Sequence, residues 1–325
     1  MGAKVLIVTR TFGRYSQEPL NFLSRNGFEV LRSENLEPSF LKGVDALIVG
    51  TNPVTADMIE SSNLKIIAKH GVGVDNIDLE AATKKGIPVT ITLGANSQAV
   101  AELTIAFIFV LARKLMIAHE KLFKNRKWEG VVGYEVGGKT LGVIGFGAIG
   151  REVAKRAVCL GMRVLVYDPY ASKETIETHS AQSVDLETLL KESDFVSIHA
   201  PLTEETRNMI GEREISLMKK SAFLINTSRG GLLDEDALVK ALKEGRIAGA
   251  ALDVFQEEPL PEDSPFFDCP NLITTAHIGA HTVEAIYRMN MMAAQAIVDY
   301  FNKKIPKHVV NREVVEMLKK MGFEE

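Results

Sequence analysis

Four ionisable side chains follow short apolar segments in the second half of the chain. Arg229 comes after "FLINTS", Asp253 and Glu258 come after "GAAL", and His277 comes after "LITTA". If these segments are parallel strands, their carboxyl ends meet at one edge of a sheet, which is where ligands bind in such sheets. A cation, carboxylates and an imidazole gathered there beside a nicotinamide ring would suit hydride transfer to or from a 2-hydroxy acid.

Each of these groups has a definite use in that reaction. Histidine can take the hydroxyl proton or return it, because its ordinary pKa of about 6.5 lies near neutral pH. We therefore assign the acid/base role to His277, with the Glu258 carboxylate holding its ring. The guanidinium of Arg229 can bind a substrate carboxylate through two parallel hydrogen bonds. Taken singly, the three residues also have structural explanations: a helix-terminus ion pair, a solvated loop position and a backbone-bonded core histidine.

The nicotinamide itself is suggested by the segment "LGVIGFGAIGR" at residues 141–151. Gly145 permits a tight turn after a predicted strand, Gly147 lets backbone N–H groups approach a pyrophosphate, and Gly150 lets helix and strand pack closely. Such a glycine pattern alone also marks ordinary strand-to-helix turns, so its context decides. The turn also contains Ala148 and Ile149, which we include in the cofactor site.

The context agrees with a dinucleotide site. The next predicted strand, "RVLVYD", ends at Asp168, which lies 23 positions after Gly145. A carboxylate there can accept hydrogen bonds from the ribose hydroxyls and would repel a 2′-phosphate. The sequence therefore predicts NAD as cofactor in preference to NADP.

Continuous apolar runs alternate with helical patterns along the chain, as in parallel sheets that are covered on both faces. Aspartates begin three of the helical segments, at positions 78, 185 and 234, and one long helix is predicted over 97–125. The alternation occurs twice, so we predict two α/β domains with a cleft between them. The predicted strands are 4–8, 28–31, 46–50, 65–69, 88–92, 140–145, 163–168, 194–201, 222–228, 248–254 and 271–276.

Composition excludes several classes of protein. The 325 residues are 46% hydrophobic and 25% charged, with a net charge of −4, so neither nucleic acid nor an anionic membrane is expected as a partner. The apolar run at 103–112 is too short for a membrane span, which needs about 20 residues. Cys159 and Cys269 belong to no metal-spaced cluster, so no metal is predicted and a reducing, cytoplasmic location is expected.

Several longer motifs resemble the D-2-hydroxyacid dehydrogenase family: "GFGAIGRE", "HAPLTEETRNMIG", "LMKKSAFLINTSRGGLLDEDAL", "GAALDVFQEEP" and "AHIGAHTVEA". The resemblance covers nearly the whole chain. Within the family, the chain is most similar to the phosphoglycerate dehydrogenase branch. It implies Arg229 as substrate anchor, His277 as acid/base, Glu258 as its partner and Asp253 as ligand of the nicotinamide carboxamide. It also extends the cofactor site to Pro201, Thr206 and Thr227. Formate dehydrogenases of the family carry glutamine at the position of Glu258, which argues against formate as substrate.

The resemblance also implies the domain plan. A Rossmann NAD-binding domain, residues 99–286, is inserted into a flavodoxin-like substrate domain made of residues 1–98 and 287–325. Within "KHGVGVDNID", the N–H groups of Gly71, Val72 and Gly73 would face the substrate carboxylate, although this motif could also be a plain turn. Asn96 and Ser97 would lie at the hinge and cleft. His281 would reach the substrate or cap the following helix.

The match is weakest at the substrate's distal end. Phosphoglycerate enzymes often carry arginine in the stretch corresponding to "IVGTNPVT", where this chain has Gly50, Thr51 and Asn52. Arg10 and Arg14 could bind a phosphate instead, or could be solvated loop residues. Nor is a C-terminal regulatory domain expected after "VVNREVVEMLKKMGFEE".

The expected activity is therefore NAD-dependent oxidation of D-3-phosphoglycerate, with hydroxypyruvate or glyoxylate reduction as the alternative. An NAD-sensing binding protein similar to the transcriptional corepressors is the alternative of another class. Its candidate partner surface is the basic stretch "RKLMIAHEKLFKNRKW", although cations at a helix C-terminus also simply complement the helix dipole. The family implies a homodimer through the long helix and the "WEGVVGYEVGG" segment.

Overall fold

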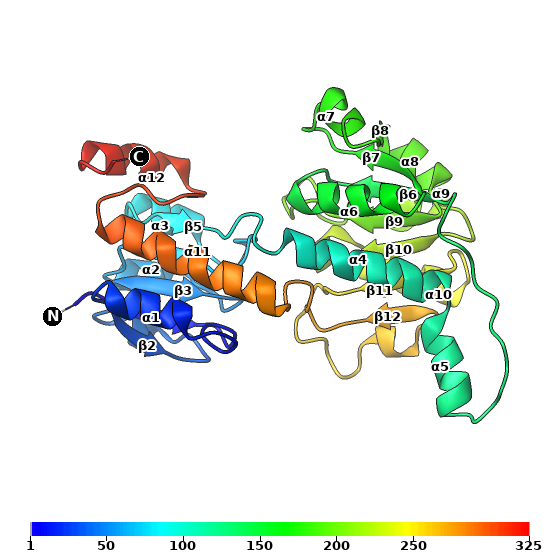
Figure 1. Cartoon of the computed structure of the whole chain (residues 1–325), viewed down its shortest axis with the longest axis horizontal. Helices are drawn as coiled ribbons and strands as arrows, with labels where there is room; N and C mark the ends of the chain where they lie inside the picture. Colours follow the sequence, from blue (N-terminus) through cyan, green and yellow to red (C-terminus); the bar gives the residue numbers. More distant parts are fainter. Residues whose placement is uncertain (1, 325) are drawn as a thin grey trace. The chain divides into compact units, whose positions relative to one another are not determined.

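The computed structural model describes residues 2–324, which form two compact units. One unit runs up to Asn96 and resumes at His281, and the other is Ser97–Ala280. The predicted boundaries, after residue 98 and before residue 287, lie within a few residues of these. Each unit is a doubly wound α/β domain with a parallel sheet (Figure 1), as the fold class predicted from the sequence requires.

The first unit contains a five-stranded sheet in the order β2-β1-β3-β4-β5, in which every pairing is parallel. Its strands are β1 (Lys4–Val8), β2 (Glu29–Arg32), β3 (Ala46–Val49), β4 (Ile66–Lys69) and β5 (Val89–Thr90). The fully buried strands β3 and β4 explain the continuous apolar runs, because both of their faces are covered by helices.

Helices cover both faces of this sheet (Figure 1). Val5 and Ile7 pack with α1 and α11 on one face, whereas Leu6 and Val8 pack with α2 and α3 on the other. The helices are α1 (Glu18–Arg25), α2 (Ala56–Ser61), α3 (Leu79–Lys84), α11 (Val283–Phe301) and α12 (Arg312–Lys320), with a 3₁₀ turn at Pro38–Leu41. Because α11 and α12 come from the end of the chain, this unit is discontinuous in sequence.

The second unit contains a seven-stranded parallel sheet in the order β12-β11-β10-β9-β6-β7-β8. Its strands are β6 (Thr140–Ile144), β7 (Arg163–Tyr167), β8 (Gln182–Ser183), β9 (Phe195–Ile198), β10 (Phe223–Asn226), β11 (Gly249–Leu252) and β12 (Leu272–Thr274). The strand order reverses at β6, between β7 and β9. The glycine turn follows β6 and therefore lies at the switch point where such folds bind ligands.

The helices of the second unit also form two layers. α4 and α6 pack on the face that includes Leu141 and Val143, and the residues of α8, α9 and α10 pack on the opposite face. The helices are α4 (Ser97–Ala112), α5 (Leu115–Phe123), α6 (Ala148–Cys159), α7 (Lys173–Glu177), α8 (Leu186–Glu192), α9 (Glu212–Leu217) and α10 (Glu235–Lys243), with 3₁₀ turns at Gly230–Leu232 and Pro265–Asp268.

The three aspartates at predicted helix starts are N-caps. The carboxylates of Asp78, Asp185 and Asp234 each accept a hydrogen bond from the backbone N–H three residues later, at 2.8 to 3.0 Å. These bonds satisfy N–H groups that have no partner inside the helix. The predicted beginnings of α3, α8 and α10 are confirmed.

The single helix predicted over 97–125 is wrong, because the chain breaks between α4 and α5. Lys114 adopts a left-handed backbone conformation with φ 50°. The carbonyl oxygen of Ala112 accepts a hydrogen bond from the Tyr134 N–H at 2.8 Å, so the returning segment ends α4. Gly133 lies against this carbonyl so closely that a Cβ would overlap it. Apolar periodicity does not reveal a break that a distant segment imposes.

The apolar run at 103–112 lies inside α4. Among residues 2–324, no helix is long and apolar enough to cross a membrane.

Candidate active site

An imidazole and a carboxylate face each other on two loops of the second unit. Nδ1 of His277, beyond β12, lies 2.7 Å from Oε2 of Glu258, beyond β11. Their side chains are 37% and 33% exposed, so the pair is open to a ligand but partly shielded from water. Because Nδ1 is engaged by Glu258, Nε2 is the ring nitrogen available for proton transfer. The sequence prediction that these two residues meet is confirmed.

Two forces act on the Glu258 carboxyl. Burial opposes its ionisation, but the hydrogen bond and charge of His277, the Phe255 N–H at 3.0 Å and the charge of Arg229 outweigh burial and lower the pKa of Glu258. The carboxylate is therefore ionised well below neutral pH, ready to accept the imidazole N–H and to stabilise an imidazolium.

The loop that carries His277 is fixed by Asp253. The Asp253 carboxylate accepts hydrogen bonds from the Thr275 hydroxyl at 2.5 Å and from the N–H groups of Ile278 and Gly279 at 2.8 Å. Its carbonyl oxygen accepts the His277 N–H, also at 2.8 Å. His277 has φ 50°, a conformation that non-glycine residues rarely adopt and that this network holds.

Asp253 is only 1% exposed and already accepts three hydrogen bonds at its carboxylate. The structure thus gives this residue a part in positioning His277 that the sequence did not reveal. Its predicted contact with a nicotinamide carboxamide stays a prediction.

Arg229 lies on the loop after β10, next to Gly230. Its Nη1 donates to the Ser228 carbonyl at 2.7 Å, and its own carbonyl accepts from the Asn226 side chain at 2.8 Å. The residue is partly exposed, and its positive charge acts on Glu258. A guanidinium, a carboxylate and an imidazole are therefore assembled at the carboxyl edge of one sheet, as the sequence predicted.

The glycine turn fits a dinucleotide. Gly145 has φ +91°, and a Cβ there would meet the backbone of His199 and Ala200. A Cβ on Gly150 would overlap the Gly145 carbonyl oxygen, so helix and turn are in direct contact. In contrast, a Cβ on Gly147 would meet nothing within 4 Å. Gly147 is the N-cap of α6 and supplies no side-chain acceptor, so the first N–H groups of the helix suit a phosphate.

Asp168 lies beside this turn. Its Oδ2 accepts the Phe146 N–H at 2.6 Å, and its Oδ1 accepts the N–H groups of Tyr170 and Ala171 at 2.8 and 3.0 Å. The carboxylate therefore ties the end of β7 to the glycine turn, close to where a ribose would follow a pyrophosphate. Its contact with the ribose stays a prediction.

The other predicted cofactor residues differ in exposure. Ala148 is exposed and Ile149 is half-buried at the start of α6. The Thr206 hydroxyl donates to the Pro201 carbonyl at 2.7 Å and so stabilises the loop after β9. Thr227 is buried, and its hydroxyl lies 3.0 Å from that of Thr104 on α4. The side chain of Thr227 therefore contributes to packing, which leaves only its backbone for a cofactor.

Four predicted substrate ligands lie in the first unit. Among residues 2–324, the N–H groups of Val72 and Gly73 have no hydrogen-bond acceptor, and Oδ1 of Asn96 is buried without a partner. The Gly71 N–H, in contrast, donates to the Thr92 hydroxyl at 3.1 Å, and its predicted role toward a carboxylate stays a prediction. Ser97 is buried at the start of α4 in the second unit.

Three cations of the first unit have partners within the protein. Arg10 is 73% exposed and pairs with Glu34 at 3.5 Å, and the Arg14 guanidinium lies 5.8 Å from the centre of the Tyr15 ring. Lys69, which is only 6% exposed, donates to the Gly50 carbonyl at 2.5 Å and to Asn76. These contacts favour the structural explanation of Arg10 and Arg14 that the sequence left open.

His281 does not cap the helix that follows it. Oγ1 of Thr282 accepts the Ala285 N–H at 3.1 Å, so Thr282 is the N-cap of α11.

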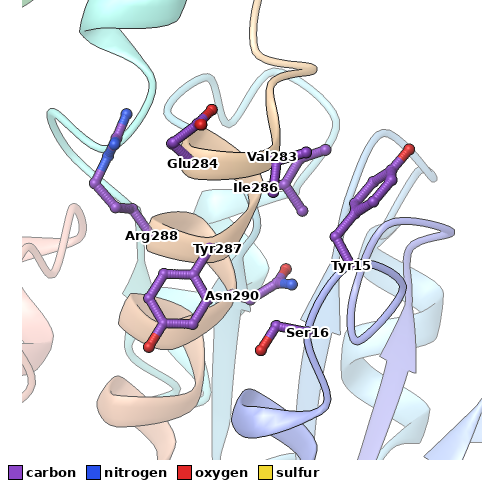
Figure 2. Close-up of a pocket in the computed structure, with 8 residues that line it drawn as sticks. All are labelled: Tyr15, Ser16, Val283, Glu284, Ile286, Tyr287, Arg288 and Asn290. Carbon is purple, nitrogen blue, oxygen red and sulfur yellow. The ribbon is translucent and has the colours of Figure 1, made fainter.

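A pocket of about 340 Å³ lies in the first unit between the loop after β1 and the beginning of α11 (Figure 2). Tyr15, Val283 and Ile286 gather on one side, and Asn290 lies deeper. The Asn290 side chain is hydrogen-bonded at 2.7 Å to His70, which directly follows β4. The pocket contains none of the predicted site residues. Among residues 2–324, no cluster of three potential metal ligands is present.

Known proteins are similar to this chain over most of its length. The sequence profile described as D-isomer specific 2-hydroxyacid dehydrogenase, NAD binding domain, matches residues 105–279. A glyoxylate reductase of Thermococcus litoralis is 44% identical, with 85% of this chain and 86% of the relative covered. A hydroxypyruvate reductase of Thermotoga maritima is 45% identical, with coverages of 82% and 89%. A D-3-phosphoglycerate dehydrogenase of Methanocaldococcus jannaschii is 47% identical, but the match spans 52% of that protein.

Solved structures show the same fold. The TT0316 protein of Thermus thermophilus is 35% identical with a TM-score of 0.85, and 94% of this chain and 99% of that chain are covered. An NAD-dependent formate dehydrogenase of Staphylococcus aureus in complex with NAD is 30% identical with a TM-score of 0.81, with coverages of 92% and 96%.

Proposed function

Because the chain belongs to the D-isomer specific 2-hydroxyacid dehydrogenase family, we propose that it reduces a small unphosphorylated 2-oxo acid, glyoxylate or hydroxypyruvate. The chain is an NAD-dependent oxidoreductase that acts on the CH–OH group of 2-hydroxy acids. The observation that carries the proposal is the 2.7 Å hydrogen bond between Glu258 and His277 in the same unit as the NAD site.

The proposed roles follow from the geometry. Bound NADH supplies the hydride to the carbonyl carbon. Nε2 of His277 donates a proton to the carbonyl oxygen, and Glu258 stabilises the imidazolium before transfer and fixes the ring. Arg229 binds the substrate carboxylate and so orients the substrate carbonyl toward the nicotinamide ring. In the oxidative direction, His277 takes the hydroxyl proton instead.

We keep Val72, Gly73 and Asn96 as proposed substrate ligands. The N–H groups of Val72 and Gly73 and the side chain of Asn96 have unused hydrogen-bonding capacity that suits a carboxylate and a hydroxyl.

Two observations favour an unphosphorylated substrate over D-3-phosphoglycerate, the first expectation from the sequence. Arg10 pairs with a carboxylate, Arg14 lies beside an aromatic ring, and Lys69 donates to the Gly50 carbonyl and the Asn76 side-chain oxygen. In addition, the glyoxylate and hydroxypyruvate reductases match over most of their length. Phosphoglycerate oxidation remains the second candidate because of the 47% identity to one such enzyme.

A panel of 2-oxo acids tests the proposal. The purified protein is assayed for NADH consumption with glyoxylate, hydroxypyruvate and 3-phosphohydroxypyruvate. We expect the largest kcat/KM with one of the first two. A larger value with the phosphorylated acid would support the second candidate, and no turnover on any of them would contradict both.

We further propose that the protein is a homodimer. Exposed apolar side chains are concentrated on α5 and on the segment that follows it, where a second copy would remove them from water. These residues are Leu115, Met116, Ile117, Leu122, Phe123, Trp128, Val132 and Tyr134. Light scattering should give twice the chain mass, and a monomer at micromolar concentration would contradict the proposal.

A further inference from the structure

We propose that Glu235, at the first turn of α10, is a positioning residue for the Glu258–His277 pair. This inference rests on the proposed function, because it concerns how the acid/base pair is held for the reaction. Glu235 does not contact the imidazole. It acts on the short segment 254–258, which connects β11 to Glu258.

Glu235 holds this segment through the backbone. Its Oε1 accepts the Gln256 N–H at 2.7 Å, and the Gln256 side chain donates to the Leu233 carbonyl at 2.8 Å. Gln256 is therefore tied at two points to the residues on either side of Asp234, the N-cap of α10. Since Asp234 fixes where the helix begins, the helix start serves as a rigid support for the segment.

The preceding N–H group holds the catalytic carboxylate. The Phe255 N–H donates to Oε1 of Glu258 at 3.0 Å, while Oε2 of Glu258 receives the His277 Nδ1–H at 2.7 Å. Two consecutive peptide N–H groups are thus bound by two carboxylates, one structural and one acting on the imidazole. Loss of the Glu235 acceptor would free the Gln256 N–H and let the Phe255–Gln256 backbone rotate, which would shift Glu258.

The same backbone also borders the substrate anchor. A Cβ on Gly230 would overlap the carbonyl carbon of Phe255 and the nitrogen of Gln256, so these atoms lie directly on Gly230. Gly230 is the residue next to Arg229. A displacement of residues 255–256 would therefore reach the guanidinium as well as the carboxylate.

The electrostatics of Glu235 agree with this arrangement. Burial raises the pKa of Glu235, the bond from Gln256 opposes this, and the negative charges of Asp236 and Glu258 raise it further. Stabilisation of α10 is a weak explanation for Glu235, whose carboxylate is partly buried near that of Glu258. The exposed Asp236 already complements the helix dipole.

Substitutions separate positioning from stability. Glu235→Gln keeps an oxygen that can accept the Gln256 N–H, whereas Glu235→Leu and Glu235→Ala remove it. Asp236→Leu is the matched control, because it removes an acidic residue from the same helical turn without contact to Gln256. We expect kcat to fall about tenfold or more in the Leu and Ala variants, with Glu235→Gln and Asp236→Leu within about threefold of wild type. NADH affinity, measured by fluorescence, should stay unchanged in all four.

A double-mutant cycle tests whether Glu235 acts through Glu258. If it does, Glu235→Leu will lower kcat by a clearly smaller factor in a Glu258→Gln background than in the wild-type background. Equal fold-losses in both backgrounds would overturn the proposal, as would failure of Glu235→Gln to retain activity or a wild-type kcat in the Leu and Ala variants. An inactive wild-type protein would instead contradict the proposed function, so the two failures are distinct.

Discussion

Gly150 packs directly on Gly145, so that a Cβ on Gly150 would overlap the Gly145 carbonyl oxygen. The carbonyl oxygen belongs to the backbone and the Cβ would be bonded to it. Neither atom could move away without opening the turn between β6 and α6. We therefore expect Gly150→Ala to destabilise the second unit and to abolish NADH binding. Thermal melting and NADH fluorescence would detect both effects, and a variant with wild-type melting and affinity would contradict this view of the turn.

For Gly147→Ala, in contrast to Gly150→Ala, we expect no loss of stability. Its Cβ would enter open space, and its backbone needs no left-handed conformation, so the melting temperature should stay close to that of wild type. NADH affinity should nevertheless fall, because the methyl group would occupy the approach of a pyrophosphate to the helix. Unchanged affinity would indicate that the cofactor does not pass over Gly147.

Glu258→Gln tests the charge beside the imidazole. The interactions with His277, Phe255 and Arg229 lower the pKa of Glu258, so the negative charge persists as pH falls until this lowered pKa is reached. Glutamine removes that charge at every pH and so disfavours the imidazolium. In the oxidative direction, we expect the acid limb of the pH–rate profile to move to lower pH. A limb at the wild-type position would show that the two side chains are not coupled.

Arg229→Lys separates charge from geometry. Lysine keeps the positive charge but cannot form two parallel hydrogen bonds to a carboxylate. We expect kcat/KM for the preferred 2-oxo acid to fall by about two orders of magnitude, with NADH affinity unchanged. Activity within a few-fold of wild type would argue that the carboxylate is bound elsewhere, for example by the N–H groups of Val72 and Gly73.

Half-buried His70 indicates how acid affects the stability of the fold. Burial, together with the nearby positive charges of Lys69 and His281, lowers its pKa to about 4, although the bond to Asn290 opposes this. As pH falls below about 6.5, the unfolded chain takes up a proton that the folded chain does not, so stability decreases until about pH 4. The total loss from this residue is roughly 3 kcal/mol.

His70→Gln removes this titration. Urea unfolding of the variant at pH 7 and pH 5 should show a smaller loss of free energy of unfolding than wild type between the two values. The comparison with wild type cancels the contribution of His199, whose pKa is also lowered by burial, to about 3. Equal losses in the two proteins would show that the folded state does not hold His70 as a neutral imidazole.

Much of the architecture could be predicted because buried parallel strands have an unmistakable local signal. Continuous apolar runs such as Ala46–Val49 and Ile66–Lys69 mark strands with two covered faces, and aspartate caps mark the helix starts. The short edge strand Gln182–Ser183 lacks this signal and was not predicted. The segment 88–92 forms a strand only at Val89–Thr90.

Site residues could be predicted where the side chain itself takes part in the reaction. They could not be predicted where the residue acts by binding the backbone of a segment distant in sequence. Arg229, Glu258 and His277 could be named from strand ends because charged groups there meet at one edge. The network of Asp253 with Ile278 and Gly279, and the bond of Glu235 to Gln256, join residues 21 to 26 positions apart. The sequence offered only one indication of these contacts: Asp253 and Glu235 both lie next to loops that carry predicted site residues. The expected cytoplasmic location stays a prediction.

The central claim is that His277, held by Glu258, transfers the proton during reduction of a 2-oxo acid. The most direct measurement is kcat of His277→Ala with the preferred 2-oxo acid, alongside NADH affinity of the same variant. We predict a kcat lower by about two to four orders of magnitude with NADH still bound, as for loss of a general acid. A kcat close to that of the wild-type protein would contradict the account.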